Sequence, residues 1–220
     1  MLYFLSTPIG NLGDLSERAK EILAAAELVL AEDTRQAGKI LAHLGLRKKT
    51  VSLHEHTGTA KIDWVVAQIK SGQEAVYLSD AGTPGLSDPG GKLAAAALAS
   101  EVEISPVPGP SALTALISVA PFSCQNFIFL GYFPKKKGRQ KMLATIEKAK
   151  MPIFFYESPH RIQKTVQLLA DNLADYKILI GRELTKKFEQ VIFADLSDKL
   201  AESVRPQGEF VFALVQKKKI

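Results

Sequence analysis

The stretch EAVYLSDAGTPGLSDPGGKLAAAALAS, residues 74–100, joins an apolar run to an alanine-rich segment through a turn rich in glycine and proline. The apolar run at 75–79 has the length of a buried strand, and the segment at 92–100 has apolar residues at helical spacing. Glycine lets a backbone approach a ligand closely, and proline restricts the shape of a turn before binding. The stretch therefore predicts a strand, a ligand-binding turn and a helix.

The same alternation continues through the first half of the chain. Strands are expected at 2–6, 28–32, 50–54, 75–79 and 102–107, and helices at 15–27, 34–45, 60–72, 92–100 and 111–120. Asp33 and Asp88 are typical N-cap residues, and Gly45 and Gly72 stand where helices are expected to end. Strands that alternate with helices in this way predict a mainly parallel sheet with helices on both faces.

The second half has a different pattern. Strands are expected at 126–133, 152–158, 176–184, 188–196 and 208–216, and helices at roughly 139–149, 159–173 and 197–204. Because residues 183–216 are predicted to be mostly strand, part of this sheet should be antiparallel, which makes it a mixed sheet. The division between the halves is expected near Pro121. The prediction is thus two α/β domains, at 1–120 and 121–220.

Composition limits the class of protein. The single Cys124 excludes an internal disulfide and fits a reducing compartment, and no Cys/His cluster has zinc spacing, so no metal is expected. Apolar stretches are far shorter than the ~20 residues of a membrane span, and the N-terminus has no basic leader. We therefore expect a cytoplasmic, soluble protein with no membrane partner. The net charge of +5 is compatible with an anionic partner but does not by itself indicate one.

Three unusual turns follow strands in the first half, at 7–14, 79–90 and 106–112. In an open parallel sheet, such loops gather outside the carboxyl ends of the strands, where ligands bind. The turns contain neither a P-loop nor a GxGxxG motif that opens a helix, so a phosphate site is not indicated. Each could be only a tight turn, but three at matching positions favour a small-molecule pocket.

Seven motifs carry a resemblance to a known family. They are TPIGNLGDLSERA (7–19), AEDTRQ (31–36), SLHEH (52–56), SDAGTPGLSDPG (79–90), PVPGPSA (106–112), FYESPHR (155–161) and RELTKKFE (182–189). In this order they resemble the tetrapyrrole-methylase superfamily, and more closely its ribosomal RNA branch, whose members methylate a cytidine ribose 2′-oxygen in small-subunit (16S) rRNA. The resemblance implies two α/β domains of this type, S-adenosylmethionine (SAM) held between them, and a homodimer.

The resemblance also implies that main-chain groups of the turns hold SAM. The matching positions are Pro8, Gly10, Ser79, Asp80, Ala81, Gly82, Thr83, Ser111, Ala112 and Tyr156. Among them, Asp80 could accept a hydrogen bond from the ammonium or a hydroxyl group of SAM, or it could form an Asx turn that stabilises the loop.

Carboxylates and histidines near strand ends are candidates for the reaction itself. A ribose hydroxyl is a poor nucleophile, so a base or a hydrogen-bond acceptor should lie near it. Asp33, Glu55 and Glu157 are candidate bases or orienting groups, and His54 or His56 could also serve. For Asp33, the role of a helix N-cap is an equally good explanation.

A further group of residues is predicted to contact the RNA. It comprises Arg35, His54, His56, His160, Arg161, Lys186, Lys135, Lys136 and Lys137. The triplet at 54–56 is expected to end the third strand with both histidines on one face, and Arg35 suits a phosphate. The lysines lie on the loop FPKKKGRQK (133–141), which we call the basic loop and which can neutralise RNA phosphates. A polar surface cluster and ordinary solvated charge are the alternatives.

Two other functions remain open. A methylase of a tetrapyrrole or another small molecule would share the cofactor half, but should lack the basic loop and the motifs at 32–35, 54–56 and 157–161. A non-catalytic RNA-binding module would leave the three glycine-rich turns unexplained. Members of the ribosomal branch usually continue beyond the last strand into a helical segment. If that segment holds RNA, substrate binding by this chain is expected to differ.

Overall fold

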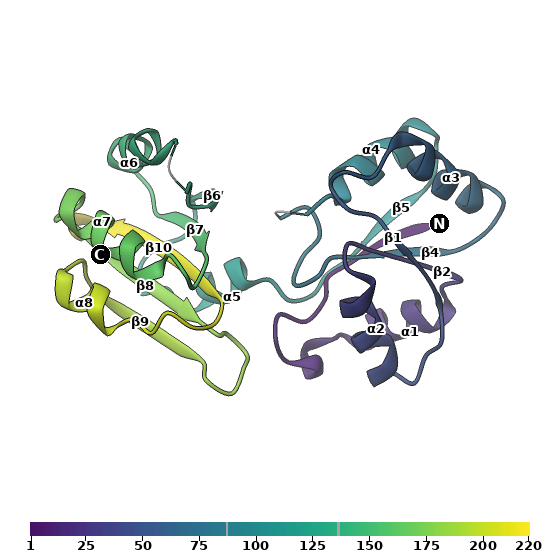
Figure 1. The fold of residues 1–220 in the computed structure, drawn as a ribbon, viewed down its shortest axis with the longest axis horizontal. Coiled ribbons are helices and arrows are strands. Elements are labelled where there is room, and N and C mark those ends of the chain that lie inside the picture. The colour runs from purple at the N-terminus through teal and green to yellow at the C-terminus, as the bar shows by residue number, and fades with distance from the viewer. Residues whose placement is uncertain (87, 136) are drawn as a thin grey trace. The chain divides into compact units, whose positions relative to one another are not determined.

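The computed structural model describes residues 1–86, 88–135 and 137–220, and its contacts divide the chain into two compact units, Met1–Ser111 and Ala112–Ile220. The first unit has a fully parallel sheet of five strands in the order β3-β2-β4-β1-β5 (Figure 1). The strands are β1 (Leu2–Leu5), β2 (Leu28–Ala31), β3 (Lys49–Ser52), β4 (Ala75–Leu78) and β5 (Ile104–Val107). The predicted parallel sheet is confirmed.

Helices cover both faces of this sheet (Figure 1). They are the short η1 (Leu12–Asp14), α1 (Glu17–Ala25), α2 (Thr34–His43), α3 (Thr59–Lys70) and α4 (Gly90–Ala99). Apolar residues of α1 and α2 form one cluster with the sheet, and those of α3 and α4 form another. All residues of β2 and β4 are buried, which explains why these strands are continuous apolar runs without polar alternation.

Two helices of the first unit end as predicted. Gly45 and Gly72 follow the last turns of α2 and α3 with φ of +67° and +105°. Each takes part in a pair of hydrogen bonds that closes the helix; at α2, Gly45 N–H donates to the Ala42 carbonyl and Leu46 N–H to that of Leu41. Glycine adopts this left-handed conformation without the steric cost that a Cβ brings.

The second unit contains a mixed sheet in the order β6-β7-β10-β8-β9 (Figure 1). Its elements are α5 (Ala112–Ser118), β6 (Ile128–Tyr132), α6 (Arg139–Lys148), β7 (Ile153–Glu157), α7 (Ile162–Asn172), β8 (Tyr176–Arg182), β9 (Gln190–Asp195), α8 (Asp198–Ser203), β10 (Phe210–Gln216) and the short η2 (Lys217–Lys219). Only β6 and β7 pair in parallel, and the other pairs are antiparallel. The mixed sheet is as expected, but residues 183–189 and 204–209 are loops, so the region 183–216 contains less strand than predicted.

Helix α5 explains where the two units divide. Residues on one face of the second sheet, such as Ile180 and Phe212, pack in a cluster with α6, α7 and α8. On the opposite face, a Cβ added at Gly181 would lie 2.9 Å from the Leu116 side chain of α5. This helix therefore belongs to the second unit, and the division falls before α5, whereas the sequence placed it after the helix, at Pro121.

Candidate functional site

The three glycine-rich turns of the first unit are bonded to one another. Thr7, after β1, and Gly82, after β4, exchange both backbone hydrogen bonds, at 2.9 and 3.0 Å. The Thr83 hydroxyl donates to the carbonyl of Pro110, after β5, at 3.1 Å, and accepts from the Ser6 hydroxyl at 3.2 Å. The turns thus meet at the carboxyl edge of the sheet, where they are expected in an open parallel sheet.

Gly82 lies where the turns are closest. Its φ is +83°, and an added Cβ would lie 3.4 Å from Ile9 Cγ2 and 3.7 Å from the Pro110 carbonyl oxygen. The Ser79 hydroxyl donates to the Gly82 carbonyl at 2.6 Å, and the Thr7 hydroxyl donates to the Ser79 carbonyl at 3.1 Å. The turn after β4 is therefore held by a hydrogen bond within the turn and by another from the turn after β1.

The predicted cofactor residues of the first unit differ in exposure. Ser79, Gly82 and Ser111 are buried, whereas Pro8, Thr83 and Ala112 are partly exposed, and Gly10, Asp80 and Ala81 are exposed. The buried residues hold the turns together. The exposed residues form the part of the turn surface that a ligand can reach.

Carboxylates gather beside these turns. Asp80 Oδ1 accepts the backbone N–H of Asp33 at 2.9 Å, which joins the ends of β4 and β2. Burial and the nearby carboxylates of Asp80, Asp88 and Glu55 raise the pKa of Glu32. A raised pKa moves a carboxylate towards the range of a general base at neutral pH. Glu32 was not among the site residues predicted from the sequence. Its position directly after a buried strand and next to Asp33 could have indicated it.

Asp33 and Arg35 form a forked ion pair. Arg35 Nη2 lies 2.7 Å from Asp33 Oδ2, and its Nε lies 3.0 Å from Oδ1, which also accepts the Arg35 N–H. These hydrogen bonds hold the pKa of Asp33 at about 2. Asp33 is the N-cap of α2 as predicted, and its low pKa favours an orienting role over that of a base at neutral pH.

We expect the Asp33 carboxyl to titrate near pH 2, and replacing Arg35 by alanine should raise its pKa towards 3.8. Because the pKa is lowered in the folded protein, the pairing stabilises the fold above pH 4 and loses this effect as the pH falls from about 4 to about 2. Carbon NMR of the labelled carboxyl measures both values. Lys39→Ala is the control and should leave the midpoint near 2; an unchanged midpoint in Arg35→Ala would contradict the assignment.

The triplet His54-Glu55-His56 does not end a strand. Strand β3 stops at Ser52, and His54 and His56 lie in the following turn, with ring centroids 6.4 Å apart. The turn is closed by Thr57, whose hydroxyl accepts the His54 N–H at 2.8 Å. The prediction of a shared strand face is therefore wrong. Among the described residues, no three of His, Cys, Asp or Glu are arranged to hold a metal ion.

In the second unit, Glu157 and Arg161 bind each other. The Glu157 side chain is fully buried, and its Oε1 lies 2.5 Å from Arg161 Nη2. Arg161 directly precedes the first residue of α7, and the Ser158 N–H donates to Glu157 Oε1 at 2.6 Å. Burial and pairing hold the Glu157 carboxylate in place and leave the Arg161 guanidinium little freedom to move.

Two of the remaining candidates of this unit, Tyr156 and His160, are chain neighbours of that pair, and Lys186 follows β8. Tyr156 packs against Phe129 and Tyr132 with ring centroids 5.0 and 5.5 Å apart, and His160 is exposed. Lys186 Nζ lies 2.9 Å from Glu183 and 3.1 Å from Glu209. Lys186 thus has two acidic partners within the chain.

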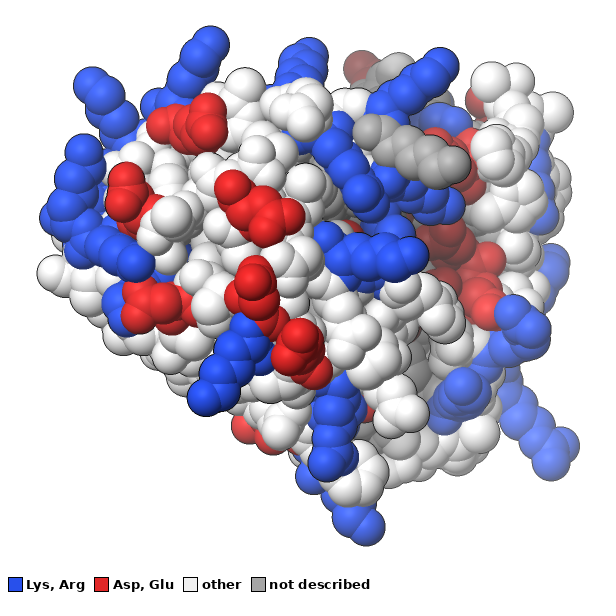
Figure 2. Space-filling model, turned by 60° about the vertical axis from the view of Figure 1, so that its left-hand side comes forward, with Lys and Arg blue, Asp and Glu red and all other residues white. Residues whose placement is uncertain are grey.

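The basic loop follows β6. Lys135 and Lys137 are exposed, and neither forms an ion pair with any described residue; the predicted Lys136 lies outside the described residues. Figure 2 shows basic and acidic side chains interspersed over one face of the molecule. Exposed lysines without an acidic partner suit contacts to individual phosphates.

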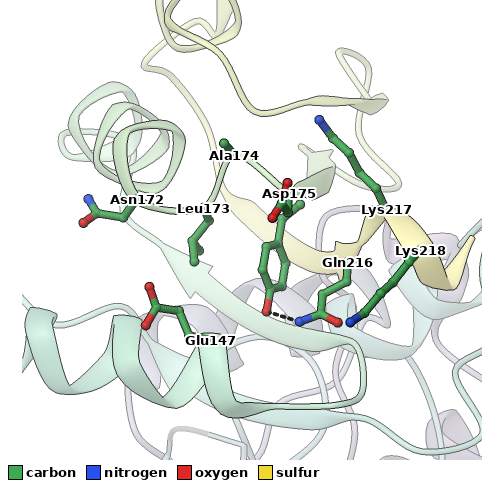
Figure 3. A pocket seen from close by; sticks show the side chains of 9 residues that line it. Glu147, Asn172, Leu173, Ala174, Asp175, Gln216, Lys217 and Lys218 are labelled. Atoms are coloured by element: carbon green, nitrogen blue, oxygen red, sulfur yellow. Dashed lines mark hydrogen bonds between the residues drawn. The ribbon is translucent and has the colours of Figure 1, made fainter.

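One pocket of the second unit lies away from all these residues. Its volume is about 340 Å³, and it lies at the start of β8 and the end of β10 (Figure 3). Glu157 instead ends β7 beside the start of β10, and Lys186 lies beyond the end of β8. Gln216 donates to the Tyr176 hydroxyl there at 2.9 Å. None of the predicted site residues lines this pocket.

Comparison with known proteins identifies the family. The family model for tetrapyrrole (corrin/porphyrin) methylases matches residues 1–200. The chain belongs to the tetrapyrrole methylase family. The resemblance of the seven motifs is thereby confirmed.

Relatives within the family carry a narrower name. Proteins named ribosomal RNA small subunit methyltransferase I are 40% identical in Vibrio cholerae (96% of this chain, 75% of the relative) and 37% identical in Leptospira biflexa (100% and 92%). The relative in Thermotoga maritima is 34% identical, with 97% of each chain covered. The similarity thus extends over both units.

Solved structures support the fold. Uroporphyrin-III C-methyltransferase from Thermus thermophilus, crystallised with S-adenosylhomocysteine, matches with a TM-score of 0.67 at 17% identity and covers 97% of this chain and 96% of its own. Diphthine synthase matches with a TM-score of 0.77 at 16% identity, covering 98% and 90%. At this identity the likeness concerns the fold, and it confirms the predicted α/β class.

Proposed function

We propose that this chain transfers a methyl group from SAM to the ribose 2′-oxygen of a cytidine in 16S rRNA of the small ribosomal subunit. The observation that carries the proposal is the 34–40% identity, over nearly the whole chain, to relatives named ribosomal RNA small subunit methyltransferase I. The exposed cations of the basic loop add support, because phosphates dominate the binding of proteins to nucleic acids.

The turns of the first unit fit SAM. Their own hydrogen bonds fix their shape, and Gly10, Asp80 and Ala81 are exposed. Asp80 uses Oδ1 to hold Asp33, while no described residue bonds to its Oδ2. That oxygen remains to accept a hydrogen bond from the ammonium or a hydroxyl group of the cofactor. The other predicted contacts in these turns, and Tyr156 in the second unit, belong to the same proposal.

Alignment is the main task of the protein in this reaction. SAM, when bound, supplies a methyl group that is already activated by its sulfonium. The protein has to hold the ribose oxygen in line, and such positioning can contribute ~7–11 kcal/mol. The 2′-hydroxyl proton needs an acceptor. Asp33 and Glu157 are held in ion pairs, so Glu55 and Glu32 are our candidates for that acceptor.

We also propose that the protein is a cytoplasmic homodimer. The family resemblance supports the dimer, as do exposed apolar side chains of the second unit at Val119, Phe127, Tyr132, Phe188 and Val191. Among the described residues, no helix has the length and apolarity to cross a membrane. Light scattering at micromolar concentration should give twice the mass of one chain, and the mass of a single chain would contradict the dimer.

Transfer of a labelled methyl group tests the substrate class. SAM with a labelled methyl group is incubated with the protein and either undermethylated small subunits or a uroporphyrinogen-type tetrapyrrole. We expect label in the RNA of the subunits and none in the tetrapyrrole. The reverse result would support a small-molecule methylase, and binding to subunits without transfer or SAM affinity would support a non-catalytic module.

A further inference from the structure

Glu157 is the centre of a buried network that the proposed chemistry does not use. Its Oε1 accepts the Ser158 N–H at 2.6 Å and lies 2.5 Å from Arg161 Nη2. Its Oε2 accepts the Thr165 hydroxyl at 2.6 Å. Thr165 is completely buried on α7, eight residues after Glu157. Every donor to this carboxylate thus comes from the turn after β7 or from the helix that follows it.

Arg161 connects this network to the basic loop. Its Nη1 donates to the Phe133 carbonyl at 2.9 Å, while its Nη2 binds Glu157. Phe133 is buried, and its N–H donates to the Tyr156 carbonyl at 3.0 Å. The side chain of Arg161 is 19% exposed, so the guanidinium is fixed inside the unit between a carboxylate and a carbonyl.

A second arginine donates a hydrogen bond to the carbonyl of the next residue of the loop, Pro134. Arg139, the first residue of α6, donates from Nε to the Pro134 carbonyl at 3.1 Å. Two consecutive carbonyls at the start of the basic loop, those of Phe133 and Pro134, are therefore held by two guanidinium groups, one directly before α7 and one at the start of α6. Lys135 follows directly and is exposed.

We propose that Glu157 and Thr165 are positioning residues that act through Arg161 to fix the basic loop for binding RNA. The inference rests on the proposed function and assigns Arg161 a role different from the direct RNA contact expected from the sequence. A fixed loop base lowers the conformational entropy that the lysines lose when they meet phosphates. Thr165 cannot itself contact RNA because it is buried.

Thr165→Val tests the network with little change in volume, since valine has a methyl group in place of the hydroxyl. We expect KM for small subunits to rise on the order of ten-fold, within the hundred-fold that a misplacement of ~1 Å can cost. SAM affinity and kcat should stay within two-fold of the wild type, because the Thr165 hydroxyl bonds to Glu157, which is not one of the proposed cofactor contacts. Thr165→Ser retains a hydroxyl and should restore KM.

Tyr176→Phe is the matched control. The Tyr176 hydroxyl is also buried and donates to the Ile146 carbonyl at 3.0 Å, but it lies at the opposite end of β8 from Arg182. Its loss should lower the melting temperature as much as Thr165→Val does, without changing KM. If both variants change KM equally, or if folded Thr165→Val has wild-type KM, the positioning role is wrong.

If the proposed function itself is wrong, the experiment gives a different result from the one expected when only the positioning role is wrong. In that case the wild-type protein would transfer no label to small subunits, and no KM could be measured for any variant. The positioning role would then be overturned together with the RNA substrate. Wild-type activity with an unchanged KM in Thr165→Val would overturn the positioning role alone.

Discussion

Replacing Gly82 by valine is expected to lower SAM affinity by about 100-fold or more. The added Cβ alone would lie 3.4 Å from Ile9 and 3.7 Å from the Pro110 carbonyl, and the two further methyl groups have to push the turns apart. A β-branched residue is also strained at a φ of +83°. Since the turns are held by hydrogen bonds across this contact, the displacement should spread to the exposed groups that bind the cofactor.

Gly72→Val is the control that tests whether backbone strain alone lowers SAM affinity, because Gly72 lies outside the three turns. Gly72 has a φ of +105°, and an added Cβ meets nothing within 4 Å. This variant should lose stability through the strained backbone, yet bind SAM normally. Calorimetric titration with SAM or S-adenosylhomocysteine measures the affinity, and circular dichroism checks the fold. A folded Gly82→Val protein with wild-type affinity would show that the turns are not the cofactor site.

Replacing Lys135 and Lys137 together by alanine is expected to weaken binding of small subunits and to reduce its salt dependence. Both side chains are exposed and, within the described part of the chain, have no acidic partner. Each phosphate contact contributes ~0.7–0.9 to the slope of log affinity against log salt, so the slope should fall by about 1.4–1.8. SAM affinity should not change.

Lys218→Ala combined with Lys219→Ala removes the same charge elsewhere. These two residues belong to η2 after β10. Filter binding of labelled subunits at several salt concentrations gives the slopes. The control should retain the wild-type slope. An equal decrease in both double variants would mean that net charge, not the basic loop, determines the affinity.

Much of the fold could be predicted because its signals are local. The apolar runs of β2 and β4 indicated buried strands, and Gly45 and Gly72 marked helix ends by a conformation that glycine favours. The convergence of the turns followed from a general property of parallel sheets. Even the Asp33 N-cap was evident from the residue type and its position before a helical pattern.

The parts that could not be predicted depend on contacts between distant residues. Asp80 holds the N–H of Asp33, 47 positions away, and Arg161 holds the carbonyl of Phe133, 28 positions away. Local patterns contain no information on such pairs. The motif FYESPHR suggested a base and an RNA contact, whereas Glu157 and Arg161 bind each other. This pair is local, but the motif does not show that Glu157 is buried, and a buried charge needs a partner.

Nucleoside analysis of the methylated RNA shows whether the methyl group is transferred to the ribose of a cytidine. Undermethylated small subunits are incubated with the protein and SAM carrying a labelled methyl group, and the 16S rRNA is digested to nucleosides, which are separated and identified by mass. We expect label in 2′-O-methylcytidine, with the mass of the methyl group on the ribose fragment. Label on the base of any nucleoside, or on the ribose of a nucleoside other than cytidine, would contradict it.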